Sequence, residues 1–256
     1  IIYANDSDVF LSVLPLHHTY ECTCNFLTPI YLGCKIVISD GLRHIAKNMQ
    51  ENGITVLITV PLLLETVYWK IISNIEKKGK MGVFKTATAV NGILLKLGIN
   101  VSNKLFKDIF EAMGGKLRLV IAGAAALDPI VAKGFSNMGI RCIQGYGLTE
   151  SSPIATVETD QMRAIGSVGV PMPGTEIVIK DQNDEGIGEI CIKSPSIMVG
   201  YLDEKDNAKA FDEEGYFRTG DLGYMDKKGF LYISGRKKNV IVTKNGKNIF
   251  PEELEA

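Results

Sequence analysis

Short apolar runs alternate with helix-like segments over the first 160 residues of the chain. The runs are rich in β-branched side chains and predict buried strands at 8–16, 35–38, 53–58, 116–121 and 141–144. The segments between them have helical patterns, broken by glycine, and predict helices at 21–32, 42–52, 62–78, 84–113 and up to about Met138. Strands that alternate with helices predict a parallel sheet with right-handed crossovers.

The pattern changes near residue 160, where helical periodicity disappears and short strands take over. Residues 175–179 and 188–192 alternate apolar and polar side chains around a turn at 182–186, which predicts a β-hairpin. Similar turn residues recur at 226–229 and 245–246. The second half of the chain is therefore expected to be rich in β-structure.

The two patterns together predict a mixed α/β fold. We expect an α/β lobe with a parallel sheet over residues 1–160 and a small β-rich, barrel-like subdomain over residues 161–234. Hydrophobic residues make up 46% of the 256 residues and charged residues 22%, which is typical of a globular protein with a sizeable core. The composition excludes disordered, collagen-like and coiled-coil chains.

Charge and cysteine content narrow the range of partners. The 28 basic and 29 acidic residues give a formal net charge of −1, so no nucleic acid or anionic membrane is indicated by composition. The richest apolar stretch, 54–69, is too interrupted to span a bilayer, and no secretory signal is present. Five cysteines without CxxC spacing are expected to be reduced thiols of a cytoplasmic protein.

Both ends of the sequence fall inside a pattern. The chain begins at Ile1 without an initiating Met and stops at 251–256, where proline and acidic residues predict the start of a helix. So short a helix cannot bury an apolar face, and we therefore expect a piece of a longer polypeptide, truncated at both ends.

A glycine-rich segment with hydroxyl and acidic residues follows one of the predicted strands. Gly145 and Gly147 let the backbone approach a ligand, Tyr146 offers an aromatic face, and Thr149 can donate a hydrogen bond to a phosphate. Glu150 supplies a hard oxygen suited to Mg²⁺. An ordinary strand-to-loop turn explains the same residues about equally well.

Small residues at 122–126 follow another predicted strand. Because ligands in open α/β sheets bind beyond the carboxyl ends of strands, this loop and the one at Gly145 could form the floor of one pocket. A close contact between a helix and a strand also needs small residues, and the loop taken alone favours that explanation.

Three further residues carry weaker chemical signals. Asp221, after a Thr–Gly turn, is an acceptor that suits the two vicinal hydroxyls of a ribose, although an Asx turn is the commoner outcome. Arg236, in the basic turn 234–239, has a fork that can hold hydroxyl or phosphate oxygens, but such turns are usually only solvated. His18 forms a pair with His17 that makes a poor metal site without spaced partners.

Together and in this order, five segments resemble the adenylate-forming superfamily, which includes acyl-CoA synthetases, peptide-synthetase adenylation domains and firefly luciferase. The segments are LPLHHTYE (14–21), AGAAALDP (122–129), QGYGLTESSP (144–153), GYFRTGDLGY (215–224) and SGRKKNVIVTKNGKNIFPEELE (234–255). Within the superfamily the chain is most similar to bacterial long-chain fatty acyl-CoA synthetases. The last segment and the long, partly helical stretch between His18 and Gly123 carry that finer resemblance.

The resemblance implies part of a large N-terminal domain and a two-step ligase reaction of fatty acid metabolism. A carboxylate attacks the α-phosphate of ATP to give an acyl-adenylate and pyrophosphate, and coenzyme A then displaces AMP. The resemblance also implies that Tyr146 stacks on adenine, that Asp221 and Arg236 hold the ribose, that Thr149 contacts phosphate and that Glu150 coordinates Mg²⁺.

The remaining roles implied by the resemblance concern the acyl pocket and a hinge. Four small residues would line the pocket for adenine and the acyl-adenylate: Gly123, Ala124, Gly145 and Gly147. His18 would lie near the carboxylate and phosphate. Lys238 matches a hinge about which a small C-terminal domain rotates, so residues 235–256 are expected to be the hinge and the start of that domain.

Two parts of the superfamily pattern are absent from the sequence. No Ser/Thr/Gly-rich phosphate loop with its lysine precedes the His motif, and the C-terminal lysine that contacts the substrate carboxylate does not occur. We therefore expect these 256 residues alone to be an inactive part of a long-chain fatty acid–CoA ligase.

The sequence leaves several alternatives open. The substrate could be an aryl or medium-chain acid, the acceptor a carrier protein, or the chain a non-catalytic AMP- or acyl-binding remnant. The expected partners are a fatty acid, ATP and coenzyme A, with no nucleic acid. Peripheral membrane contact stays open, although no amphipathic basic helix is apparent.

Overall fold

The computed structural model describes residues 4–125, 127–159, 161–239, 241–242 and 248–249. The chain forms two compact units, Ile1–Gln144 and Gly145–Ala256. The finer division expected from the sequence, with boundaries near 160 and 234, remains a prediction. The expected turn at 245–246 and helix start at 251–256 lie outside the described residues.

The first unit is built on a parallel sheet, which confirms the predicted fold class. Its strands pair in the order β2-β1-β3-β4-β5, and every pair is parallel. The strands are β1 (Val9–Ser12), β2 (Lys35–Ile38), β3 (Val56–Thr59), β4 (Leu119–Ala122) and β5 (Arg141–Tyr146). All four residues of β3 are buried, as expected for a central strand covered on both faces.

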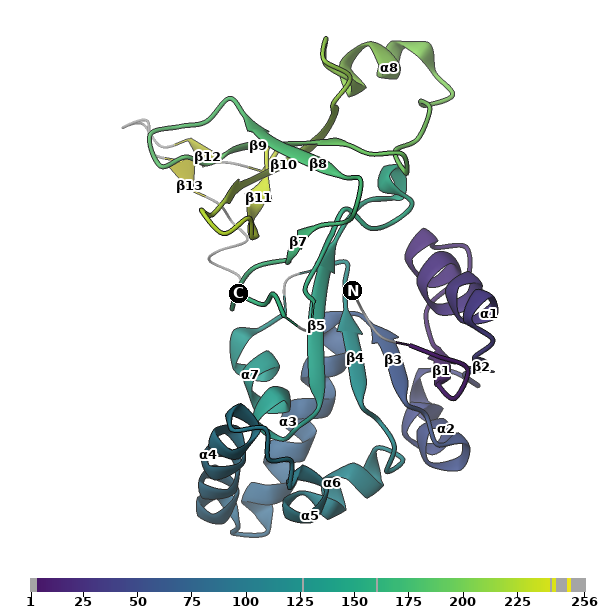
Figure 1. The fold of residues 1–256 in the computed structure, drawn as a ribbon, viewed down its shortest axis with the longest axis vertical. Coiled ribbons are helices and arrows are strands. Elements are labelled where there is room, and N and C mark those ends of the chain that lie inside the picture. The colour runs from purple at the N-terminus through teal and green to yellow at the C-terminus, as the bar shows by residue number, and fades with distance from the viewer. Residues whose placement is uncertain (1–3, 126, 160, 240, 243–247, 250–256) are drawn as a thin grey trace. The chain divides into compact units, whose positions relative to one another are not determined.

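Helices connect these strands, and Figure 1 shows α3, α4 and α7 gathered together beside the sheet. The helical segments are a π-helix (Glu21–Leu27), α1 (Thr28–Leu32), a 3₁₀ turn (Leu42–His44), α2 (Ile45–Asn52), α3 (Pro61–Lys77), α4 (Met81–Lys96), α5 (Ser102–Leu105), α6 (Lys107–Ala112) and α7 (Pro129–Asn137). The helical stretch expected over 84–113 divides into α4, α5 and α6, and the glycine break predicted within it is present. The chain breaks after α4 because Gly98 takes the left-handed φ of +78°, which glycine adopts without strain.

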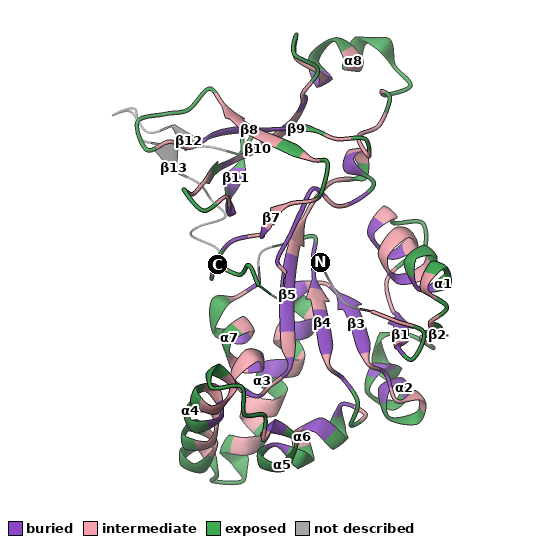
Figure 2. Ribbon diagram, in the orientation of Figure 1, coloured by how far each residue is buried: buried purple, intermediate pink, exposed green. Residues whose placement is uncertain are grey.

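One apolar cluster fills the first unit between the sheet and its helices. Leu57 of β3 and Val120 of β4 meet Leu64 of α3 and Phe135 of α7, and the Tyr68 and Phe135 rings lie 5.5 Å apart. In Figure 2 β3 and most of β4 are coloured as buried, whereas much of α4 is coloured as exposed. This core holds the carboxyl ends of β3 and β4 in fixed register.

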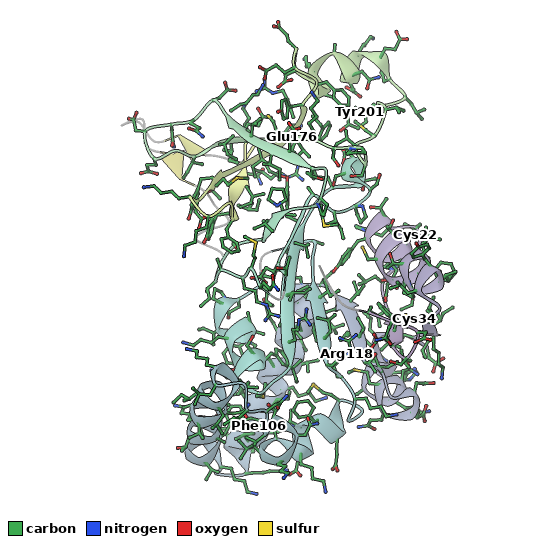
Figure 3. The ribbon with its side chains drawn as sticks, in the orientation of Figure 1. Cys22, Cys34, Phe106, Arg118, Glu176 and Tyr201 are labelled. Carbon is green, nitrogen blue, oxygen red and sulfur yellow. The ribbon has the colours of Figure 1, made fainter. Side chains whose placement is uncertain are left out.

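A buried carboxylate ties the amino ends of three strands. Asp8 accepts from Arg118 at both oxygens, with Nε donating to Oδ1 at 2.9 Å and Nη2 donating to Oδ2. The Thr55 hydroxyl donates to Oδ1 at 2.7 Å and the Asn5 amide to Oδ2 at 3.1 Å. Arg118 is labelled in Figure 3. Burial alone would raise the pKa of Asp8, but these donors hold it below its usual range.

The second unit is antiparallel, as the hairpin pattern predicts. The last two residues of β5 pair with β6 (Thr156–Val157), which pairs with β7 (Val170–Pro171). A four-stranded sheet follows in the order β11-β10-β9-β8. Its strands are β8 (Glu176–Lys180), β9 (Gly188–Lys193), β10 (Phe217–Met225) and β11 (Leu231–Arg236).

Short elements complete the second unit. They are a 3₁₀ turn (Thr149–Ser151), α8 (Glu204–Ala210) and the strand pair β12 (Ile241–Val242) and β13 (Asn248–Ile249). The helix α8 therefore lies after residue 160, where the sequence shows no helical periodicity. The Asp203 side chain caps α8 by accepting from the Lys205 amide at 2.9 Å, and this cap starts a helix that is too short to show periodicity.

Candidate functional site

A carboxylate and a guanidinium face each other across two strands of the second unit. Asp221 on β10 lies directly opposite Arg236 on β11, and Arg236 Nε lies 2.8 Å from Asp221 Oδ1. The β10 strand bulges here, because the three residues 219–221 lie opposite Ile190 alone on β9. Gly220 takes a φ of +72° within the bulge. Bulges of this kind redirect side chains next to functional sites.

The structure corrects the local setting of the residues predicted for this site. Asp221 lies within a continuous strand instead of after a turn, because the bulge accommodates the Thr–Gly pair. Arg236 is the last residue of β11, and both it and the turn that follows are exposed. Lys238 lies in that turn, which the Asn239 amide closes by donating to the Arg236 carbonyl at 2.9 Å.

An aromatic side chain also contacts the Asp221 carboxylate. Tyr146, the last residue of β5, donates its hydroxyl to Asp221 Oδ2 at 2.6 Å. The glycines beside it have a packing role, since a Cβ on Gly147 would lie 1.9 Å from the Pro153 carbonyl oxygen. A Cβ on Gly145 would lie 3.0 Å from the Thr156 carbonyl oxygen. The predicted ligand approach at these two glycines remains a prediction.

The surroundings of Asp221 leave its carboxylate able to accept further hydrogen bonds. Burial raises the pKa of Asp221 above its usual range, against the lowering effects of the Tyr146 hydroxyl and the Arg236 charge. The carboxylates of Glu150 and Glu189 raise the pKa of Asp221 further. Burial also raises the pKa of Tyr146, so its hydroxyl remains a donor at neutral pH.

A second buried carboxylate supports the bulge. Glu189 on β9 accepts from Arg218 Nε at 3.1 Å and from Lys237 Nζ at 2.9 Å, and its other oxygen accepts from the Gly220 amide at 3.2 Å. Burial raises the pKa of Glu189, but the two cations outweigh burial and hold it below its usual range. Glu189 therefore remains ionised and fixes the backbone beside Asp221.

The acidic residue of the glycine-rich segment is also held by a phenol. Glu150 lies in the 3₁₀ turn (Thr149–Ser151), and its Oε1 accepts from the Tyr201 hydroxyl at 2.7 Å. Burial raises the pKa of Tyr201 to about 12, and the hydrogen bond to Glu150 adds to this. Thr149 is exposed. Figure 3 labels Tyr201 among the side chains of the second unit.

Three other predicted residues gather in the first unit. A Cβ on Gly123 would lie 2.8 Å from the Tyr20 ring, so the loop after β4 packs directly against Tyr20. The Tyr20 amide donates to His18 Nδ1 at 3.1 Å, which links the exposed imidazole of His18 to the same region. Ala124 takes a φ of +71°, a strained value for a residue with a Cβ. Such strain is concentrated at functional sites.

Several participating residues were not identified from the sequence. Tyr20, Glu189 and Tyr201 reach their partners across long stretches of chain, and no local pattern marks those contacts. The fully buried Glu21 accepts from Ser12 Oγ at 2.5 Å and from Asn25 Nδ2 at 3.0 Å. The π-helix that carries Glu21 differs from an α-helix by one extra residue per turn, which apolar periodicity does not reveal.

The arrangement in the second unit suits a ligand with vicinal hydroxyls and an aromatic ring. An ionised carboxylate accepts two hydroxyl hydrogens, and a half-exposed guanidinium beside it can turn to donate. Within the described part of the chain, no three His, Cys, Asp or Glu side chains gather around a metal position.

Comparisons with known proteins agree with this chemistry. A family model described as AMP-binding enzyme matches residues 2–202. Long-chain-fatty-acid–CoA ligase 6 of Mus musculus is 30% identical over 269 residues, covering 100% of this chain and 38% of its own. The ligase FadD15 of Mycobacterium bovis is 35% identical and is covered over 42% of its length. The chain thus spans about two fifths of the curated relatives it matches.

Solved structures share the fold. O-succinylbenzoate coenzyme A synthetase (MenE) of Bacillus subtilis, in complex with AMP, superposes with a TM-score of 0.73 at 22% identity, covering 99% of this chain and 46% of MenE. The ATP-bound RpMatB-BxBclM chimera B3 has a TM-score of 0.73 at 24% identity, with 98% and 44% coverage. At such identities the likeness concerns the fold alone.

Proposed function

Because this chain belongs to the AMP-binding enzyme family, we propose that its second unit holds the nucleotide of an adenylate-forming acyl-CoA ligase. The observation that carries the proposal is the cluster of Tyr146, Asp221 and Arg236 around one buried carboxylate. The family match supports AMP as the ligand. Among the similar structures, one MenE structure is in complex with AMP and another with ATP and magnesium ion.

The ribose would replace contacts that the side chains now make with one another. Asp221 accepts the two ribose hydroxyls, and Arg236, whose side chain is 54% exposed, swings aside to donate to the same oxygens. Tyr146 presents its ring to adenine. The raised pKa of Asp221 means that these hydroxyls relieve an unfavourable buried charge, which favours binding.

The phosphates would extend towards the 3₁₀ turn that follows β5. Thr149 donates its hydroxyl to a phosphate oxygen, and Glu150 supplies one carboxylate ligand to Mg²⁺. The single carboxylate fits a cation held mainly by substrate phosphates, which it would screen during attack at the α-phosphorus. Tyr201 orients Glu150 by its hydrogen bond and leaves Oε2 for the cation.

The acyl half of the reaction is proposed for the first unit. Gly123 and Ala124 line the pocket beyond β4, and His18 lies beside the carboxylate that attacks the α-phosphate. If Nδ1 of His18 accepts from the Tyr20 amide, the neutral ring carries its proton on Nε2, from which it can donate to an oxyanion. Lys238, in the exposed turn after β11, serves as the hinge between the two half-reactions.

We further propose a long-chain fatty acid as the substrate and coenzyme A as the acceptor. The names of the curated relatives, which are long-chain fatty acid ligases at about 30% identity, support this choice. An aryl or medium-chain acid is the second candidate, because MenE and MatB share the fold. The five cysteines are unpaired thiols, which supports action in a reducing compartment such as the cytoplasm.

The test is carboxylate-dependent exchange between ATP and pyrophosphate, measured on the gene product that carries this sequence. A panel of fatty, aryl and amino acids is compared, with Asp221→Ala as the variant and Asp184→Ala, at an exposed position between β8 and β9, as the matched control. Exchange that peaks with long fatty acids and is lost only in Asp221→Ala supports the proposal. A peak with another acid overturns the long-chain fatty acid as the substrate and keeps the proposed reaction. No exchange with any acid overturns the proposed activity.

A further inference from the structure

The stretch from the end of α3 through α4 and α5 to the start of α6, in the first unit, is rich in positive charge. Residues 77–107 contain seven lysines and no acidic residue, although the whole chain has a net charge of −1. All seven are exposed: Lys77, Lys78, Lys80, Lys85, Lys96, Lys104 and Lys107. Only Lys107 forms an ion pair within the described residues, with Glu111 at 3.6 Å. This basic hairpin (residues 77–107) therefore carries an excess of positive charge, which the nearby Glu76, Asp108 and Glu111 offset only in part.

An apolar stripe runs along the exposed face of α4 in the same hairpin. Val83, Val90 and Leu97 are spaced by seven residues, so they lie two helical turns apart on nearly the same line. Their exposures are 72%, 46% and 69%, and Ile93 beside them is 61% exposed. Figure 2 shows the exposed colour along this helix.

The opposite side of α4 is fixed to the unit. Asn91 is fully buried, and its Nδ2 donates to Ser102 Oγ at 2.9 Å and to the Asn137 carbonyl at 2.8 Å. The Phe84 ring packs edge-on against Phe106 at 6.0 Å. Because these contacts fix the rotation of α4 about its axis, the stripe of Val83, Val90, Ile93 and Leu97 is held facing outward.

We propose that this hairpin binds the surface of a bilayer that contains anionic phospholipids. The stripe enters the boundary between headgroups and acyl chains, while the long lysine side chains pair with anionic headgroups. A helix with an apolar face flanked by lysines is the usual form of an interfacial anchor. Among the described residues no helix is long and apolar enough to cross a membrane.

Charge complementarity favours an anionic bilayer over other partners for this surface. Seven cations without a carboxylate would repel a second copy of the same hairpin, which argues against a dimer through this face. Nucleic acid would engage the lysines, but it offers nothing to cover four exposed aliphatic side chains. An anionic bilayer satisfies both features together. The proposal is independent of the nucleotide site.

The experiment is co-sedimentation of the gene product with vesicles of phosphatidylcholine, with and without phosphatidylserine. Binding is expected only with phosphatidylserine, and it should fall steeply as salt rises. The triple variant Lys77→Gln, Lys78→Gln, Lys80→Gln should weaken the partition by about tenfold or more. The charge-matched control is Lys205→Gln, Lys209→Gln, Lys228→Gln, whose lysines are exposed in the second unit and should leave binding unchanged.

A second pair of variants tests the stripe. Val90→Ser with Ile93→Ser should weaken binding by about tenfold, whereas Leu42→Ser with Ile130→Ser, at exposed apolar positions outside the hairpin, should not. Equal binding of both pairs, or no binding to either vesicle, overturns the proposal. Preferential capture of RNA, lost in the triple lysine variant, would also overturn it.

Amide hydrogen exchange covers the remaining outcome. Exchange of α4 that slows on adding phosphatidylserine vesicles supports the proposal. Exchange of α4 that the vesicles leave unchanged would overturn the proposal.

Discussion

Two buried aspartates pair with arginine in this molecule, and folding shifts their pKa values in opposite directions. Asp8 accepts two hydrogen bonds from the Arg118 guanidinium, one from the Thr55 hydroxyl and one from the Asn5 amide, and its pKa is lowered. Asp221 receives a phenol and an ion pair from Arg236, and its pKa is raised. Both carboxylates are nearly inaccessible to water.

The difference supports a structural role for Asp8 and the proposed ligand-binding role for Asp221. Asp8 has a donor in each direction, so nothing more can bind and the charge strengthens the fold. Asp221 has fewer donors than its burial requires, and the neighbouring carboxylates of Glu150 and Glu189 worsen the balance. A buried charge without enough donors binds further donors well.

The largest expected effect is on AMP affinity, which substitution of Asp221 should lower and substitution of Asp8 should not. Asp221→Ala should weaken AMP binding by more than about 100-fold, since each hydrogen bond to a charged group is worth roughly 1.5–3 kcal/mol. Asp8→Asn should leave the affinity within about twofold. Isothermal titration of AMP into the gene product measures both values. A similar loss in the two variants would show that the comparison reflects stability alone.

Stability should give the reverse order. Asp8→Asn should lower the free energy of unfolding by about 2–3 kcal/mol, because it removes the charge that Arg118 and Thr55 hold. Asp221→Asn should change it by less than about 1 kcal/mol, since it removes an unfavourable buried charge. Urea unfolding followed by circular dichroism checks both. A larger loss in Asp221→Asn would break the comparison.

Removing one donor should sharpen the role of Asp221. Tyr146→Phe keeps the aromatic ring but removes the hydroxyl that lowers the Asp221 pKa, so that pKa should rise further. AMP affinity at neutral pH should fall by about tenfold or less. The acid limb of the affinity profile should move to higher pH. An unchanged profile would separate the hydroxyl from the site.

The smallest expected effect is the pH dependence of stability. The pKa of Asp8 is lowered on folding, so its contribution is full above the unfolded-state pKa and is lost as pH falls through the folded-state value. The pKa of Asp221 is raised, so its contribution is present below the unfolded-state pKa and is lost as pH rises through the folded-state value. The stability difference between wild type and each Asn variant should therefore change with opposite sign on acidification. Slopes of the same sign would contradict the assignment.

The sequence predicted those parts of the fold that depend on local pattern. The strands of the parallel sheet and the hairpin of β8 and β9 follow from apolar alternation and turn residues, and both are present. The break after α4 follows from Gly98, which the helical pattern also predicts. The helix α8 depends on a single capping carboxylate, Asp203, which is also common in turns.

For the site, the sequence could name residues but not their partners. Asp221 and Arg236 were predicted to act on one ligand group, and the antiparallel register places them opposite each other. The contacts of Glu189 with Arg218 and of Tyr201 with Glu150 join segments far apart in the chain. Such contacts depend on tertiary packing, which spacing along one sequence does not encode. No amphipathic basic helix was apparent from the sequence, because only the contacts of the buried Asn91 show which face of α4 is turned outward.

The bulge in β10 has a consequence for how this sheet can vary. Along β10 the buried positions are Phe217, Thr219, Asp221 and Gly223, so the binding carboxylate occupies a position in the sheet core. Deleting one residue at Gly220 would turn the carboxylate to the opposite face and bury an apolar neighbour in its place. Insertions in the turn at 226–229 leave that register untouched. We therefore expect length variation among relatives in this turn but none between Thr219 and Asp221.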